Sequence, residues 1–154
     1  GRSRVVVATL SLAALAALPW PAGPHVTRPP AAPAFAQSVD ATGAWQPWSM
    51  GRVDELVAAG RPVFVDFTAA WCVTCQYNKK TTLADEQVLA DLRRHNVALL
   101  RADWTRRDPA ITAALAALGR NGVPVYVFYR KGSAPVVLSE VLGVEEVRSV
   151  IANR

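Results

Sequence analysis

Three short and almost wholly apolar runs most constrain the fold that this chain can adopt. They are "PVFVDFT", "VALLRADW" and "VPVYVFY", at residues 62–68, 97–104 and 123–129. Apolar runs of this length are typical of strands that are buried on both faces of a sheet. The segments between them have the apolar spacing of helices, so the sequence predicts an α/β fold with helices on both faces of a central sheet.

The expected helices have recognisable starting points. Asp108 followed by Pro109 places a capping side chain and a proline at the first turn of one helix. Another helix should begin near Cys72, break at residues 81–82 and restart with Asp85 as its cap. The helix that opens after residue 108 should separate two strands of the sheet.

The last two predicted strands, residues 123–129 and 134–140, flank the short connection "RKGS". They should therefore pair as an antiparallel hairpin. Helices separate the strands at residues 62–68, 97–104 and 123–129 from one another. These three strands are therefore expected to run parallel. A closing amphipathic helix is predicted at residues 144–154. The sequence thus predicts a mixed central sheet.

The N-terminal residues 5–20 carry no charge and follow Arg2 and Arg4. We interpret this run as the end of a transmembrane helix, although a signal peptide cleaved after "AFA" at residues 34–36 and a buried core helix remain alternatives. Basic residues before a membrane span favour the cytoplasmic side. The first two interpretations therefore place the rest of the chain outside the cytoplasm.

Residues 21–43 are rich in proline and alanine and show neither helical nor strand periodicity. Such a segment is typical of a semi-extended linker. The predicted organisation is a membrane segment at residues 1–20, a linker at 21–43 and a folded domain at 44–154. Apolar residues make up 51% of the chain, which is enough for a core without disulfide staples.

The net charge of +5 comes partly from basic pairs that are scattered along the chain: Arg93 with Arg94, Arg106 with Arg107, and Arg130 with Lys131. Nucleic-acid-binding surfaces usually gather their basic residues into one patch or stripe. The sequence therefore predicts a solvated surface and no nucleic-acid partner.

Both cysteines lie in "AAWCVTCQ", at residues 69–76. A structural zinc site needs four ligands, and His25 and His95 each stand alone, so no metal site is predicted. Copper(I) held by the two thiolates remains an alternative. A purely structural disulfide would close a very small loop, where the entropic stabilisation is least.

A redox role explains the position of the cysteines better. Cys72 should lie in the first turn of a helix, where unpaired backbone N–H groups and the helix dipole stabilise a thiolate. Cys75 follows three residues later on the same face. The pattern predicts Cys72 as the nucleophile and Cys75 as the thiol that resolves a mixed disulfide.

Asp66 lies in the middle of an otherwise apolar predicted strand, six residues before Cys72. A carboxylate without a partner is costly to bury, so its presence there needs an explanation. We interpret it as a carboxyl of raised pKa that accepts the proton of Cys75. The alternative is a residue at a strand end that faces water.

Pro124 stands at the start of a predicted strand, where proline lacks the N–H that pairing requires. A cis Val123–Pro124 bond would explain it and would expose strand backbone to a substrate. We expect Val123 and Trp71 to contact that substrate.

These residues together resemble a known fold. "VFVDFTAAWCVTC" followed by "GVPVYVFY" resembles the thioredoxin fold. More narrowly, "FTAAWCVTCQYNKKTTLADEQV" with "LLRADWTRRDPAI" is similar to the C-terminal domain of DsbD-type transmembrane protein-disulfide reductases, including their ScsB-like relatives. The resemblance covers about residues 44–152. It implies that Cys72 and Cys75 are the redox pair, Asp66 the buried acid and Pro124 the cis-proline.

The resemblance also implies a function and partners. Such a domain takes electrons from a membrane-embedded cysteine pair and delivers them to periplasmic thiol:disulfide proteins, without a cofactor. It would place this chain at a bacterial inner membrane with the domain in the periplasm, and residues 1–20 at the end of the preceding membrane domain. The chain departs from the DsbD pattern at Lys79, where DsbD has an acidic residue.

Two alternative functions remain at this point. One is a tethered thioredoxin-like reductase for cytochrome c maturation, and the other is a copper-binding module that uses both thiolates. The segment between the cysteines, Val73 and Thr74, lacks a histidine that could make the pair oxidising. The sequence therefore favours a reductase.

Overall fold

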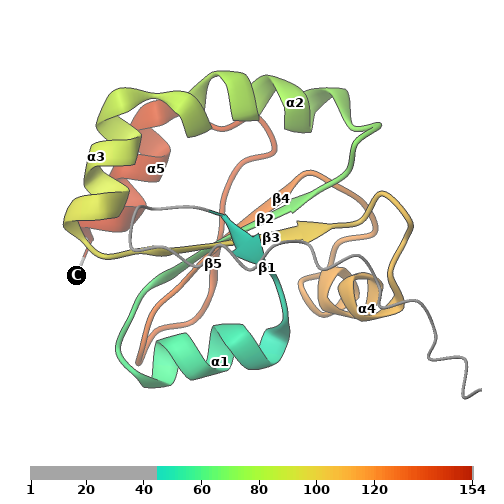
Figure 1. Ribbon diagram of the computed structural model, residues 1–154, viewed down its shortest axis with the longest axis horizontal. Coiled ribbons are helices and arrows are strands. Elements are labelled where there is room, and N and C mark those ends of the chain that lie inside the picture. Colours follow the sequence, from blue (N-terminus) through green and yellow to red (C-terminus); the bar gives the residue numbers. More distant parts are fainter. Residues whose placement is uncertain (1–44, 154) are drawn as a thin grey trace, which may run out of the picture. The chain divides into compact units, whose positions relative to one another are not determined.

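The computed structural model describes residues 45–153. The elements, in chain order, are β1 (Gln46–Pro47), α1 (Met50–Ala58), β2 (Val63–Thr68), α2 (Val73–Lys80), the 3₁₀ turn η1 (Thr82–Ala84), α3 (Glu86–Arg94), β3 (Ala98–Asp103), α4 (Pro109–Ala117), β4 (Val125–Tyr129), β5 (Val136–Val137) and α5 (Val144–Ala152). They form the predicted α/β architecture with a mixed sheet (Figure 1).

The sheet has five strands in the order β1-β3-β2-β4-β5. β1, β3 and β2 are parallel, whereas β4 is antiparallel to β2 and β5 is antiparallel to β4. The hairpin between β4 and β5 is confirmed, although β5 has only two residues where seven were expected. β1 was not predicted, because two residues are too few to show a strand pattern.

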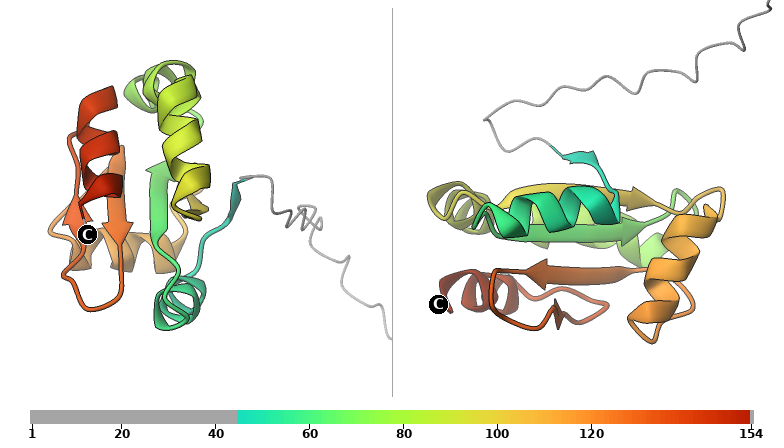
Figure 2. Two further views of the ribbon diagram at one scale, coloured as in Figure 1. Left: turned by 90° about the vertical axis from the view of Figure 1, so that its left-hand side faces the viewer. Right: turned by 90° about the horizontal axis from the view of Figure 1, so that it is seen from below.

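The prediction that β4 runs parallel to the earlier strands is wrong. β3 ends at Asp103, which is level with Thr68 at the carboxyl end of β2. β4 begins at Val125, which pairs with Phe67 at that same end. Helix α4 packs on one face near this end of the sheet and runs crosswise to the strands, so it does not carry the chain back to the opposite end (Figure 2). The chain therefore re-enters the sheet at the same end at which it left, so β4 runs opposite to β2 and β3.

Helices cover both faces of the sheet, as predicted (Figures 1 and 2). α1 and α4 pack on the face that receives Val63, Val65 and Phe67 of β2. α3 and α5 pack on the opposite face, which receives Phe64. Because side chains alternate along a strand, Asp66 points to the same face as Phe64.

The ends of the helices follow the capping side chains. The Asp85 carboxylate accepts hydrogen bonds from the N–H groups of Gln87 and Val88, at 2.9 and 3.1 Å. The Asp108 carboxylate caps α4 in the same way, and Pro109 occupies its first turn. The predicted break between α2 and α3 is confirmed, because the 3₁₀ turn η1 separates them.

The predicted membrane segment (residues 1–20) and linker (21–43) lie outside the described residues. Within residues 45–153, no helix combines the length and the apolar character needed to cross a membrane.

Candidate active site

The two cysteines lie where β2 leads into α2. Cys72 is the N-cap of α2, and its Sγ accepts a hydrogen bond from the Cys75 N–H at 3.2 Å. The two residues form a disulfide with an S–S distance of 2.01 Å. Cys72 is 6% exposed and Cys75 is fully buried. Of the two cysteines, Cys72 therefore keeps a small exposed area and Cys75 keeps none.

The structure brings the predicted substrate-binding residues to the cysteines. Val123 packs against Ala69, Cys72 and Cys75. The Val123–Pro124 peptide bond is cis, which confirms the conformation expected from the sequence. A groove of about 570 Å³ borders Pro124. Trp71, directly before Cys72, is 52% exposed.

Asp66 is fully buried in the interior of β2. The alternative of a strand-end residue that faces water is therefore wrong. Its Oδ2 accepts a hydrogen bond from the Nε of Arg101 at 3.0 Å, whereas its Oδ1 is buried without a partner among the described residues. Burial raises the pKa of Asp66, and the positive charges of Arg101 and Lys79 oppose that rise. The direction agrees with the predicted raised pKa.

Arg101 is a site residue that our sequence reasoning missed. It lies directly opposite Asp66 in the parallel pairing of β2 with β3. Its guanidinium carbon is 4.3 Å from the ring centroid of Trp45, which is a distance typical of a cation–π contact. The signal was a lone arginine inside the apolar run "VALLRADW". Its partner could be named only once the strand register was known.

Lys79, the departure from the DsbD pattern, belongs to the same group of charges. Burial lowers the pKa of Lys79, and the charge of Asp66 opposes that change. Lys79 in turn lowers the pKa of Asp66. A cation thus acts on the buried acid from α2, and Arg101 acts on it from β3.

A buried asparagine connects α2 to the chain between β5 and α5. The Asn78 Nδ2 donates to the Tyr126 hydroxyl at 3.0 Å and to the Glu140 carbonyl at 2.7 Å. Its Oδ1 accepts from the Leu142 N–H at 3.2 Å. Burial raises the pKa of Tyr126 to about 12, so its hydroxyl stays protonated. This network fixes the helix that carries the cysteines.

A family profile described as thioredoxin-like matches residues 44–131. The chain belongs to the thioredoxin-like family. The thioredoxin-like domain also matches the C-terminal domain of DsbD in sequence and in fold, as the resemblance implied.

Curated relatives include DsbD proteins, each named "Thiol:disulfide interchange protein DsbD". The protein from Ralstonia nicotianae is 36% identical over 111 residues, which are 68% of this chain and 17% of that protein. The protein from Escherichia coli is 38% identical over 82 residues, which are 50% of this chain and 14% of that protein. The chain thus spans about a sixth of the length of these relatives.

Solved structures confirm the thioredoxin-like fold. The reduced C-terminal domain of Neisseria meningitidis DsbD has a TM-score of 0.54 at 23% identity, over 68% of this chain and 89% of that chain. A thioredoxin from Thermus thermophilus has a TM-score of 0.57 at 21% identity, over 72% of this chain and 85% of that chain. At this level of identity, the similarity concerns the fold alone.

Proposed function

We propose that this thioredoxin-like domain is a thiol:disulfide oxidoreductase that works as a protein-disulfide reductase. The observation that carries the proposal is the Cys72–Cys75 disulfide at the start of α2, in which Cys72 keeps 6% of its surface exposed and Cys75 is fully buried. In the reduced form, the Cys75 N–H and the positive end of the helix dipole would stabilise a thiolate at Cys72. That thiolate is the attacking group.

The reaction would proceed in two exchanges. The Cys72 thiolate attacks one sulfur of the substrate disulfide, which breaks that bond and releases the other sulfur as a thiolate. Cys75, which is buried beside Cys72, then attacks the Cys72 sulfur and releases the second substrate thiol. The domain loses two electrons and two protons, and the substrate gains them.

Asp66 would accept the proton that Cys75 loses before its attack. Its Oδ1 is free of described partners, and burial raises the pKa of the carboxyl above that of an exposed aspartate. A carboxyl of raised pKa is the better proton acceptor near neutral pH. Arg101 and Lys79 would keep enough of it ionised for this role.

The similarity to DsbD supports a more specific role. We propose that the domain receives electrons from a membrane-embedded cysteine pair and passes them to periplasmic thiol:disulfide proteins at a bacterial inner membrane. The uncharged run at residues 5–20 supports a membrane segment at 1–20, followed by a linker at 21–43 and the domain at 44–154. A reducing pair in an oxidising compartment needs such an electron supply.

The reduction potential tests the proposed direction. We expect a value closer to the about −270 mV of thioredoxin than to the about −120 mV of DsbA, because no histidine separates the cysteines. Equilibration against dithiothreitol or glutathione, read by alkylation, measures it. A value above about −180 mV would show an oxidase or isomerase. Dithiothreitol-driven reduction of insulin that is lost in Cys72→Ser would support the reductase.

A further inference from the structure

A cation lies on the exposed indole that precedes Cys72. The guanidinium carbon of Arg107 is 5.7 Å from the ring centroid of Trp71 and 5.0 Å from that of Trp104. The two indole centroids are themselves 6.1 Å apart. Both distances to Arg107 are within the range of cation–π attraction. The positive charge is therefore held beside the surface that a partner must cross to reach Cys72.

Hydrogen bonds tie the loop of Arg107 to the loop of the cysteines. The Ala70 N–H donates to the Thr105 hydroxyl oxygen at 2.8 Å. The Trp71 Nε1 donates to the Thr105 carbonyl at 3.3 Å. The Thr105 hydroxyl in turn donates to the Asp103 carboxylate. These bonds join the segment that precedes Arg107 to the segment that precedes Cys72.

The backbone of Arg107 is held in a costly conformation. Its φ is +55°, in the left-handed region that residues other than glycine rarely adopt. Asn96, with a φ of +51°, is the other non-glycine residue with a positive φ within residues 45–153. Asparagine tolerates this region well, whereas arginine has no such advantage. Backbone strain of this kind is often found at functional sites.

The arginines of this loop lie near two carboxylates in sequence, Asp103 and Asp108, but are not paired with them. Neither Arg106 nor Arg107 forms an ion pair with a described carboxylate. The two nearest acids in sequence have other partners: Asp103 accepts from Thr105, and Asp108 accepts from the first N–H groups of α4. The approach to Cys72 is therefore apolar at Trp71 and Val73, with positive charge at its edge.

We propose that Arg107 selects protein partners whose reactive disulfide is flanked by acidic residues. The inference rests on the proposed function, since it concerns the substrates of the same cysteines. Trp71 and Val73, which are 52% and 82% exposed, would contact the apolar part of the partner. The Arg107 guanidinium would attract the carboxylates beside the disulfide and speed the encounter.

The test compares disulfide peptides that differ only in charge. Three cyclic peptides with one disulfide each carry glutamate, lysine or glutamine on both sides of their cysteines. The full chain is reduced, mixed with each peptide at low ionic strength, and quenched by alkylation at set times. In each reaction the Cys72–Cys75 disulfide forms while the peptide disulfide breaks, so two electrons and two protons pass to the peptide. The rate constants are then compared as ratios.

We expect the glutamate peptide to react about 3- to 10-fold faster than the lysine peptide. The ratio should fall towards one at about 0.5 M salt, where the Debye length is only a few ångströms. Arg107→Gln should reduce the ratio at least about twofold, and Arg107→Lys should retain it. Arg107→Gly also removes the charge and suits the positive φ, so it tests the charge without strain in the loop.

A distant arginine provides the matched control. Arg93 is exposed near the end of α3, on the opposite side of the molecule from the start of α2 (Figure 1). Arg93→Gln removes the same charge and should leave the ratio unchanged. A variant that altered only the reactivity of Cys72 would change the rate constants of all three peptides by the same factor. The ratio of the glutamate-peptide to the lysine-peptide rate constant would then stay the same.

The outcomes separate the inference from the proposed function. If the glutamine peptide is reduced but the wild-type ratio is near one, or if both neutral Arg107 variants keep the wild-type ratio, charge selection by Arg107 is wrong. If no peptide is reduced under conditions in which dithiothreitol reduces all three, the proposed reductase function is wrong, and the inference is wrong with it.

Discussion

Two buried aspartates, Asp66 and Asp91, each accept a hydrogen bond from the Nε of an arginine on another element. The distance is 3.0 Å from Arg101 to Asp66 and 2.8 Å from Arg148 to Asp91. Nevertheless, the pKa of Asp66 is raised and that of Asp91 is lowered. The presence of an arginine partner therefore does not decide whether a buried carboxyl stays ionised.

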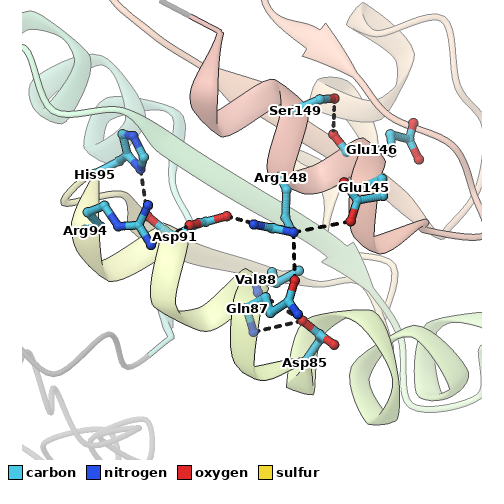
Figure 3. A network of polar contacts seen from close by, with 10 residues as sticks. All are labelled: Asp85, Gln87, Val88, Asp91, Arg94, His95, Glu145, Glu146, Arg148 and Ser149. Atoms are coloured by element: carbon cyan, nitrogen blue, oxygen red, sulfur yellow. Dashed lines mark hydrogen bonds and ion pairs between the residues drawn. The ribbon is translucent and has the colours of Figure 1, made fainter.

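Asp91 has partners for both of its oxygens (Figure 3). Its Oδ2 accepts from Arg148, and its Oδ1 lies 3.1 Å from a guanidinium nitrogen of Arg94. Arg148 also donates to Gln87 and Glu145, at 2.7 and 3.3 Å. These bonds connect α3 to α5 and lower the pKa of Asp91. The carboxylate has a structural role and stays charged.

Asp66 has only one oxygen satisfied. Arg101 occupies Oδ2, while Oδ1 is buried without a described partner, so the loss of hydration outweighs the attraction of the cations. The comparison shows that incomplete hydrogen bonding, together with full burial, accompanies a raised carboxyl pKa. It also predicts that equivalent substitutions in the two pairs have different effects.

The largest difference should be in the rate of disulfide exchange. Asp66→Asn removes the proposed proton acceptor of Cys75. The attack of Cys75 on the mixed disulfide should therefore slow about 100-fold near neutral pH. Asp91→Asn should leave that rate within about twofold, because Asp91 belongs to the α3–α5 contact. Stopped-flow exchange between about pH 6 and pH 9 measures both rates. Equal rates for wild type and Asp66→Asn would show that Asp66 is only structural.

Substitution of the arginines should have a smaller effect, on the pH dependence of the rate. Arg101→Gln removes a charge that opposes the rise in the pKa of Asp66, so this pKa should rise further. The pH profile of the disulfide-exchange rate (the exchange profile) should then move to higher pH. At pH values below the midpoint of the exchange profile, the exchange rate should fall about 3- to 10-fold. Arg148→Gln should leave the profile in place.

The double variant provides the control for that shift. In an Asp66→Asn background, Arg101→Gln should no longer move the profile, because the titrating group is absent. A shift that persists in this background would mean that Arg101 acts on the cysteines and not through Asp66.

The stability of the two pairs should depend on pH with opposite signs. The raised pKa of Asp66 contributes stability that is present below its unfolded value of 3.8 and is lost as the pH rises through the folded pKa. The lowered pKa of Asp91 contributes stability that is present above 3.8 and is lost as the pH falls through the folded pKa.

Denaturation at several pH values tests these signs. At neutral pH, Asp66→Asn should raise the free energy of unfolding by on the order of 1 kcal/mol, since a costly buried carboxylate is removed. Asp91→Asn should lower it and flatten the loss of stability in acid. A fall in stability for Asp66→Asn at neutral pH would contradict the account of Asp66.

Much of this site could be predicted from local sequence. The position of Cys72 at a helix start follows from the apolar strand before it and the helical pattern after it. The burial of Asp66 follows from its apolar neighbours. The cis bond at Pro124 follows from a proline at a strand start. Each inference uses only a few residues around one position.

The pairs of charges could not be predicted in this way. Asp66 and Arg101 are 35 residues apart, and Arg148 and Asp91 are 57 residues apart. Both contacts depend on strand register or helix packing, which no local pattern determines. The direction of β4 escaped prediction for the same reason, because it depends on the path of α4 across the end of the sheet.

The smallest predicted effect concerns Trp45, which lies on the guanidinium of Arg101. Trp45→Leu keeps an apolar side chain but removes the cation–π contact, which is worth about 0.5–1 kcal/mol at a partly exposed site. Arg101 should then hold Asp66 less firmly, so the exchange profile should move to higher pH by less than in Arg101→Gln. Trp48→Leu is the control, because Trp48 contacts Phe67 on the opposite face of the sheet. An equal shift in both tryptophan variants would show that the effect comes from general loosening of the core and not from the contact with Arg101.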